Sequence, residues 1–216
     1  MLKANGIHKS YGSLQVLKGV DLEISSSEIV SIVGSSGAGK STLLHILGTL
    51  DHPDQGLLEM NGLNLLKIKG DELAKFRNKQ IGFIFQFHNL LPEFTAKENI
   101  LIPGYISNTS EKELQKKAGE LAELLGISSR LDHKPSTLSG GEQQRVAVAR
   151  ALINSPSVVF ADEPSGNLDT QNARSLHQLF LTLREELGQA FVIVTHNEEL
   201  AELADRKVVM KDGLIL

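Results

Sequence analysis

The sequence Gly34-Ser35-Ser36-Gly37-Ala38-Gly39-Lys40-Ser41 is the most informative stretch of this 216-residue chain. It follows a continuous apolar run, Ile29 to Val33, that is typical of a buried strand, and it leads into a helical pattern at Ser41 to Leu47. Glycines let the backbone wrap closely around a phosphate group, and the N-terminus of the helix adds a favourable dipole. Lys40 supplies a positive charge, and the Ser41 hydroxyl can ligate Mg²⁺. We therefore predict a strand, a phosphate-binding loop and a helix in succession.

A second apolar run, Val158 to Ala161, ends in the adjacent carboxylates Asp162 and Glu163. Ligands of parallel α/β sheets gather at the carboxyl ends of the strands, which places both acids near the predicted phosphate site. Adjacent residues of a strand project to opposite sides, so one acid can serve a metal ion while its neighbour faces a water molecule. We assign Asp162 to Mg²⁺ and Glu163 to polarising that water as general base. Without the phosphate loop, the same pair would more often be a strand end that faces solvent.

The rest of the chain alternates between strand and helix patterns. Capping-box patterns at Ser110–Glu113 and Ser139–Glu142 each open a segment with apolar residues at helical spacing. The first of these helices is expected to end near Gly126, and a later helix at Gly188. Further strands are expected at residues 20–24, 56–62, 81–85 and 191–195. This alternation predicts one α/β domain over residues 1–216, with a helical insertion from about residue 87 to 155.

The composition of the chain argues against several classes of protein. The chain has 22 Lys and Arg against 26 Asp and Glu, a net charge of −4, which argues against a general nucleic-acid-binding protein. The absence of cysteine excludes disulfides, iron–sulfur clusters, thiolate zinc sites and cysteine nucleophiles. No apolar run approaches the roughly 18 to 20 residues that span a bilayer, and none has the character of a signal peptide. We expect a chain that does not cross a membrane itself, although a membrane partner stays possible.

A second anion site is expected where Ser139 caps a helix that begins with Gly140 and Gly141. The surrounding sequence, Leu138-Ser139-Gly140-Gly141-Glu142-Gln143-Gln144-Arg145, resembles the signature motif of the ATP-binding subunits of ABC transporters, and it precedes Asp162-Glu163 in that family's order. The resemblance extends over essentially the whole chain. It implies a P-loop NTPase (RecA-like) core of ABC type with an antiparallel β subdomain and an inserted α-helical subdomain. It also implies an Mg-dependent ATPase with ATP and Mg²⁺ as cofactors.

The resemblance also implies roles for individual residues. Two copies of the chain would pack head to tail, so that the Ser139 helix of one copy contacts the γ-phosphate of ATP bound to the Lys40 loop of the other. Tyr11 would stack on adenine, and His196 would hold the γ-phosphate. Gln86 would link Mg²⁺ and the attacking water to the membrane partner. The nucleotide contacts implied in this way are Tyr11, Gly34, Ser35, Ser36, Gly37, Ala38, Gly39, Lys40, Ser41, Thr42, Ser139, Gly140, Gly141 and Asp169, with Ser41, Gln86 and Asp162 at the metal.

The residue types alone leave other interpretations open for several of these positions. Tyr11 could be a surface aromatic that only packs, Gln86 could simply end a strand, and a lone His196 at a strand end is usually structural or solvated. The acidic and histidine residues at 51–54 could suggest a metal site, but we interpret them as a solvated turn around Pro53. Only 53 positions separate Gln86 from Ser139, which leaves no room for the long coiled coils of the DNA-repair and chromosome ATPases that share the signature.

The stretch from Gly82 to Ile100 resembles the lipoprotein-releasing (LolD-type) ATPases, in a group that also includes macrolide-exporter and cell-division ATPases. Lys97 and Ser165 depart from the pattern of these relatives, which leaves the subgroup open. The resemblance implies integral membrane permeases as partners and a peripheral location on the cytoplasmic face of the bacterial inner membrane. The alternatives are a macrolide-type exporter or a signalling complex that moves no substrate. A groove for the membrane partner is predicted along Leu90, Leu91 and Phe94, with Phe83 and Phe85 buried in a strand.

Overall fold

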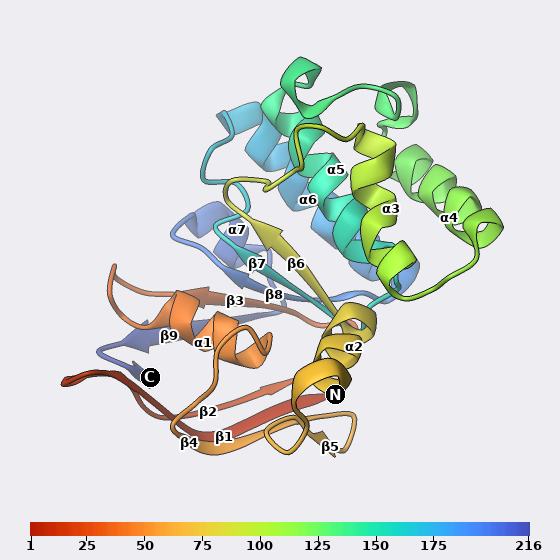
Figure 1. The fold of residues 1–216 in the computed structure, drawn as a ribbon. Coiled ribbons are helices and arrows are strands. Elements are labelled where there is room, and N and C mark those ends of the chain that lie inside the picture. The colour runs from red at the N-terminus through yellow and green to blue at the C-terminus, as the bar shows by residue number, and fades with distance from the viewer.

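The computed structural model describes residues 1–216 and contains two sheets (Figure 1). The antiparallel sheet has the order β2-β1-β4-β5, with β1 (Leu2–Tyr11), β2 (Leu14–Ile24), β4 (Gln55–Met60) and β5 (Leu63–Asn64). The second sheet has the order β10-β9-β3-β8-β7-β6, with β3 (Ile29–Val33), β6 (Ile81–Phe85), β7 (Val158–Asp162), β8 (Ala190–Val194), β9 (Arg206–Lys211) and β10 (Leu214–Ile215). Its strands run parallel except β10, which pairs antiparallel with β9. The predicted α/β class with an additional antiparallel sheet is confirmed.

Seven α-helices cover the sheets. They are α1 (Lys40–Leu47), α2 (Gly70–Gln80), α3 (Ala96–Ile106), α4 (Glu111–Leu124), α5 (Gly140–Leu152), α6 (Thr170–Leu187) and α7 (Glu198–Glu202), with 3₁₀ turns at Ser128–Arg130 and Pro135–Thr137. In Figure 1, α1 lies between the two sheets, and α3, α4, α5 and α6 gather on the opposite face of the parallel sheet. None of these helices combines the length and apolar character that crossing a bilayer requires.

The parallel sheet divides the apolar residues into two clusters, one on each face. Along β7, Val158 and Phe160 join a cluster of 27 buried residues that also contains the apolar faces of α1, β1 and β2. Their neighbours Val159 and Ala161 join a second cluster of 26 buried residues with α3 to α6. Successive residues of a strand point to opposite faces, so a strand that is buried on both sides must be apolar throughout. This requirement explains the uninterrupted apolar runs in the sequence.

Local signals fix the helix boundaries. Ser139 and Glu142 form the predicted capping box at the start of α5, in which each side chain accepts from the other residue's backbone N–H. At α4 only half of the predicted box forms, because Ser110 accepts from the Glu113 N–H without the reciprocal bond. A left-handed Gly188, with φ of 63°, ends α6 as predicted. The strand expected over residues 56–62 is shorter, since Asn61 and Gly62 adopt positive φ and turn the chain after Met60.

Candidate functional site

The loop between β3 and α1 has a backbone that only glycine accommodates at two positions. Gly39 precedes α1 in the left-handed region, with φ of 98°, and a Cβ there would lie 2.9 Å from the Leu17 side chain. A Cβ on Gly34 would lie 2.1 Å from the carbonyl oxygen of Met210 in β9. The loop therefore passes close to the neighbouring strands, and its shape depends on the absence of side chains at these positions.

Lys40, the first residue of α1, folds back over this loop. Its Nζ donates to the carbonyl oxygens of Gly34 at 2.9 Å and Ser35 at 3.0 Å. An ammonium group has three donors, so one remains for an anion in the loop while two hold the side chain in place. The positive charge and the N-terminus of α1 act on the same region, which favours a phosphate group there.

Ser41 and Asp162 bring a hydroxyl and a carboxylate together, as predicted. The Ser41 Oγ donates to Asp162 Oδ1 at 3.2 Å, although the two residues are 121 positions apart. Burial raises the pKa of Asp162, and the hydrogen bond from Ser41 and the charge of nearby His45 oppose that increase. Hydroxyl and carboxylate oxygens suit Mg²⁺, which is usually held by one or two protein ligands together with water and phosphate oxygens.

His45 is a neighbour of this pair that the sequence analysis overlooked. Its Nε2 lies 4.0 Å from Asp162 Oδ2. His45 follows Ser41 by four residues in α1, and residues four apart share one helix face. That spacing is the signal that could have placed His45 beside the predicted metal ligands.

Glu163 and His196 form a second pair of predicted residues. The Nδ1 atom of His196 lies 2.8 Å from Glu163 Oε2, and the His196 backbone N–H donates to the same oxygen at 3.3 Å. Glu163 has φ of 48°, an unusual value for a residue with a side chain, and its N–H donates to Val194 at 2.9 Å. Strained backbone of this kind persists where the surrounding structure enforces it, as at ligand sites, and here it directs the Glu163 carboxylate toward His196.

A cavity of about 580 Å³ collects most of the predicted residues. Small-molecule sites typically have volumes of about 300–1,000 Å³, so the cavity has the size of a nucleotide site. Ser35 and Ala38 do not line it; the Ser35 carbonyl holds Lys40, and Ala38 is buried in the core. Asp162 contacts the site through Ser41. The predicted residues that line the cavity are Tyr11, Gly34, Ser36, Gly37, Gly39, Lys40, Ser41, Thr42, Glu163 and His196.

The remaining predicted residues lie together elsewhere. Asp169 caps α6 by accepting from the Asn172 N–H at 2.9 Å, and Asn172 in turn approaches the start of α5, where a Cβ on Gly141 would lie 2.6 Å from its Oδ1. Ser139 and Gly140 belong to the same start of α5. None of these residues lines the cavity at Lys40. The structure thus separates the predicted nucleotide contacts into two groups.

Gln86 also lies outside the cavity, and the structure does not bring it to the Ser41 and Asp162 pair. Its Nε2 donates to Asn167 Oδ1 at 3.2 Å, and the Asn167 amide donates back to the Gln86 carbonyl at 3.1 Å. Gln86 therefore joins the end of β6 to the loop between β7 and α6.

An apolar groove of about 460 Å³ lies beside β6, and it differs from the predicted one. Phe83 and Phe85, expected to be buried, are half-buried, stack with ring centroids 5.7 Å apart and line this groove. Leu90, Leu91 and Phe94 do not line it, and Leu90 packs against the helical core. The physical reason is the position of β6 at the edge of the sheet, which leaves one side of the phenylalanines uncovered.

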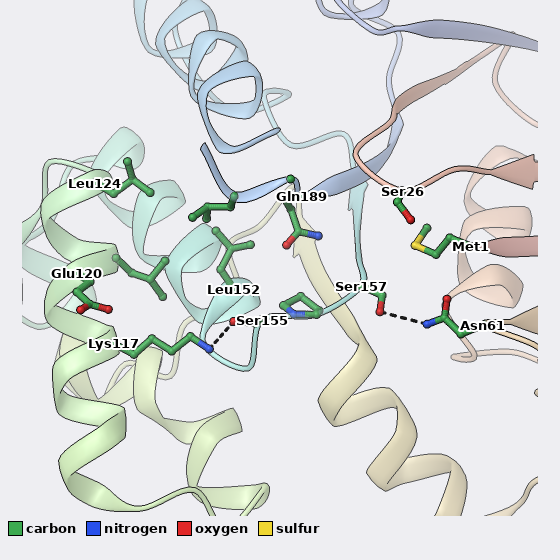
Figure 2. Close-up of a pocket in the computed structure, with 14 residues that line it drawn as sticks. Met1, Ser26, Asn61, Lys117, Glu120, Leu124, Leu152, Ser155, Ser157 and Gln189 are labelled. Atoms are coloured by element: carbon green, nitrogen blue, oxygen red, sulfur yellow. Dashed lines mark hydrogen bonds between the residues drawn. The ribbon is translucent and has the colours of Figure 1, made fainter. Parts of the chain in front are cut away.

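Another cavity, of about 520 Å³, opens between α4 and the residues around Met1 and Asn61 (Figure 2). Lys117 of α4 donates there to the Ser155 hydroxyl at 2.6 Å, and Asn61 lies 3.4 Å from Ser157. None of the residues that line this cavity is among the predicted catalytic, nucleotide-binding or metal-binding residues.

Residues 17–166 match the protein family described as ABC transporter. The chain belongs to that family. Its relatives include the lipoprotein-releasing system ATP-binding protein LolD of Bacteroides thetaiotaomicron, 61% identical over all of this chain and 99% of that protein. LolD of Cytophaga hutchinsonii is 60% identical, again over all of this chain and 99% of that protein. The predicted resemblance to LolD-type ATPases is confirmed.

Solved structures agree with this assignment. The dimeric structure of MJ0796, a bacterial ABC transporter cassette, is 40% identical and matches all of this chain and 96% of that one with a TM-score of 0.90. A second dimeric structure of the same cassette, in a post-hydrolysis state with bound ADP and phosphate, matches equally well. The predicted P-loop core of ABC type is therefore confirmed, and the chain is an ATP-binding ATPase of this fold.

Proposed function

We propose that this chain is the ATP-hydrolysing subunit of an ABC transporter that releases lipoproteins from the inner membrane. The observation that carries the ATPase part is the convergence of Lys40, Ser41, Glu163 and His196 on one cavity of nucleotide size. The full-length relatives named as lipoprotein-releasing ATP-binding proteins support lipoproteins as the class of substrate. The alternatives of macrolide export and cell-division signalling have no such support here.

The phosphate loop performs the binding step. Backbone N–H groups of residues 34–41 surround the phosphates, Lys40 directs its remaining donor at them, and Tyr11, which also lines the cavity, stacks on the adenine. Ser41 and Asp162 have the donor chemistry to hold Mg²⁺, which would neutralise charge on the phosphate oxygens when bound. Gln86 as an additional link to the metal stays a prediction.

Glu163 performs the proton-handling step. Its carboxylate lies in the cavity, where it can accept a hydrogen bond from the attacking water and orient that water toward the γ-phosphate. His196 contacts the same carboxylate at 2.8 Å and lines the cavity, so its ring can reach the γ-phosphate while it holds Glu163 in place. The mechanism consists of positioning and electrostatic stabilisation.

The second group of residues supports the proposal that two copies act together. Ser139, Gly140, Gly141 and Asp169 lie outside the cavity of their own chain, so they would contact the nucleotide bound to a partner copy. The dimeric assembly of the similar cassette supports this arrangement. Hydrolysis would then remove the phosphate that bridges the copies and let them separate.

Membrane permeases are the proposed partners of the dimer. The groove at Phe83, Phe85, Leu50 and Ile106 offers an apolar site for a helix of such a permease, and Gln86 directly follows its β6 wall. Movement of a docked helix would thereby act on the loop that contains Asn167 and Asp169. The chain would sit peripherally on the cytoplasmic face of the inner membrane.

Replacing the proposed base tests this function. Glu163→Gln should lower ATP turnover by roughly 10²- to 10⁴-fold, the usual contribution of general base catalysis, while ATP still binds. Lys40→Ala should abolish ATP binding. Tagged Glu163→Gln chain, with ATP, should recover lipoprotein-releasing permeases from detergent-solubilised native membranes. Undiminished turnover would refute the role of Glu163, and recovery of a macrolide-export or cell-division protein would refute the lipoprotein assignment.

A further inference from the structure

We propose that Asp51 and Lys9 are positioning residues for Tyr11, and that the turn at residues 51–54 sets the affinity of the site for the base of the nucleotide. The inference rests on the proposed function, because it takes Tyr11 as the residue that stacks on adenine. The sequence alone predicts a solvated turn without a role at these positions. In the structure it is bonded to the end of β1 that carries Tyr11.

Asp51 contacts both partners with separate oxygens. Its Oδ2 accepts from the Tyr11 hydroxyl at 2.5 Å, and its Oδ1 accepts from Lys9 Nζ at 2.9 Å. Burial would raise the pKa of Asp51, but the hydrogen bonds from Tyr11 and Lys9 outweigh it and bring the pKa to about 2. Asp51 is therefore ionised at neutral pH and accepts strong, charge-assisted hydrogen bonds from both groups.

Lys9 fixes the ring as well as the carboxylate. Its Nζ lies over the Tyr11 ring at 5.0 Å from the centroid, within the range of a cation–π interaction, and donates to the His52 carbonyl at 2.6 Å. The ammonium covers one face of the ring, so a base has the opposite face available. Tyr11 is half exposed, and without these contacts the ring could rotate about its side-chain torsions.

The turn itself is held at both ends. Asp54 accepts from the Ser10 N–H at 2.7 Å and donates its own N–H to the His8 carbonyl at 2.8 Å. The N–H of Asp51 donates to the His45 carbonyl of α1 at 3.2 Å. Because α1 begins at the phosphate loop, this one connection positions the phosphate-binding and base-binding parts of the site relative to each other.

The position of the Tyr11 ring should therefore affect the part of the binding affinity that comes from the base, and not the part that comes from the phosphates. Stacking of a base on an aromatic ring contributes roughly 5- to 150-fold to binding, but only if the ring is presented in the right orientation. Asp51→Asn removes the negative charge and leaves a single acceptor oxygen, so the hydrogen bonds that hold Tyr11 and Lys9 lose their charge-assisted strength. We expect Asp51→Asn to weaken Mg-ATP binding about 3- to 10-fold and to leave binding of Mg-tripolyphosphate, which lacks a base, unchanged.

The test is calorimetric titration of the full chain with both ligands, in the Glu163→Gln background to prevent turnover. Tyr11→Phe, which keeps the ring but loses the hydroxyl, should reproduce the effect of Asp51→Asn. The double variant should bind ATP as tightly as the single variant with the lower affinity, because both changes act on the same hydrogen bond between Tyr11 and Asp51. Asp21→Asn is the matched control: Asp21 of β2 also accepts from a backbone N–H of β1, that of Gly6 at 2.6 Å, but it lies outside the turn and should leave the ratio of the two affinities unchanged.

The outcomes separate the inference from the proposed function. Equal loss of affinity for ATP and tripolyphosphate, an unchanged ATP affinity, additive single effects, or the same effect from Asp21→Asn would each overturn the positioning role. If Tyr11→Ala does not weaken ATP relative to tripolyphosphate, the assignment of Tyr11 to adenine fails and the inference fails with it. If the parent chain binds neither ligand, the proposed phosphate site itself is wrong.

Discussion

The proposed role of Ser139 at a partner's phosphate can be separated from its visible role as a helix cap. In α5 the Ser139 Oγ accepts from the Glu142 N–H at 3.3 Å, and Glu142 Oε2 accepts from the Ser139 N–H at 2.8 Å. Thr95 and Glu98 form the same box at the start of α3, with the corresponding distances of 3.2 and 2.7 Å. The two caps are therefore matched in geometry, and only Ser139 is proposed to contact ATP.

Removing either cap should have the same effect on stability. Ser139→Ala and Thr95→Ala should each cost about 1 kcal/mol of unfolding free energy, which corresponds to roughly 2–4 °C in the melting temperature of a chain of this size. Their effects on catalysis should differ. A hydrogen bond to a charged group contributes roughly 1.5–3 kcal/mol, so loss of the Ser139 hydroxyl from the γ-phosphate should lower turnover roughly 10- to 150-fold. Thr95→Ala should retain turnover within about twofold.

The assay compares ATPase rates as a function of protein concentration with melting temperatures for both variants. Dimerisation with ATP in the Glu163→Gln background, followed by light scattering, gives a second measure that does not depend on turnover. Ser139→Ala should dimerise more weakly, and Thr95→Ala should behave like the parent. Equal rates and equal dimerisation for the two variants would refute a role for Ser139 beyond capping its own helix.

Two further predictions concern stability. The hydrogen bond from Arg130 lowers the pKa of Glu142 from its ordinary value near 4.5 to about 2. The stability that this pair contributes is present above pH 4.5 and is lost as the pH falls toward 2. Glu142→Gln should therefore flatten the pH dependence of the free energy of unfolding by urea between pH 2 and 4.5. The same pH dependence in the variant and the parent chain would contradict this. Gly82→Ala should lower the free energy of unfolding by about 1–3 kcal/mol, because the added Cβ would lie 2.6 Å from a carbonyl oxygen of α5. In Gly119→Ala of α4, the added Cβ would meet nothing within 4 Å, so this variant should be about 0.5–1 kcal/mol more stable than the parent. Thermal melts of the two variants check the contrast, and shifts in the same direction would refute it.

The parts of the fold that depend on local signals were predictable from the sequence. The expected strand at residues 29–33 is β3 as observed, and the helix expected from residue 41 begins one residue earlier, at Lys40. Apolar runs define strands that are buried on both faces, and the glycines before Lys40 define a loop that no other residue type can form. The same local signals placed the carboxylates at the end of β7.

The helices α2, α3 and α7 escaped prediction, and the patterns of the first two are weak. In α2, Leu73 is the one buried residue, so the helix has no apolar stripe to detect. In α3, Pro103 and Gly104 lie within the helix and normally indicate its end. The box from Thr95 to Glu98 was the available signal for the start of α3. Packing against the rest of the fold outweighs unfavourable propensity in such helices.

The lateral position of a strand also has no local signal. Phe83 and Phe85 lie in a continuous apolar run like those of the central strands, so burial was the natural expectation. Their partial exposure follows from the sheet order, in which β6 is the outermost strand, and that order depends on pairing with β7, whose residues are 77 positions further along the chain. A pattern within one segment therefore predicts that it is a strand, but not which neighbours will cover it.

The division of the site within one chain is the strongest argument that a second copy takes part in hydrolysis. Glu163 and Asp169 are six residues apart, yet Glu163 lines the cavity at Lys40, while Asp169 caps α6 beside the start of α5. The short loop between them, held to Gln86 through Asn167, is therefore the one segment that touches both groups and the end of the β6 strand. We propose that the start of α5 approaches the γ-phosphate of another copy, in which case a movement transmitted through Gln86 would reach both proposed nucleotide-contacting groups. Coupling between a membrane partner and hydrolysis would then need no additional element, because this loop connects the β6 end of the groove, the proposed base and the surface proposed to face the second copy.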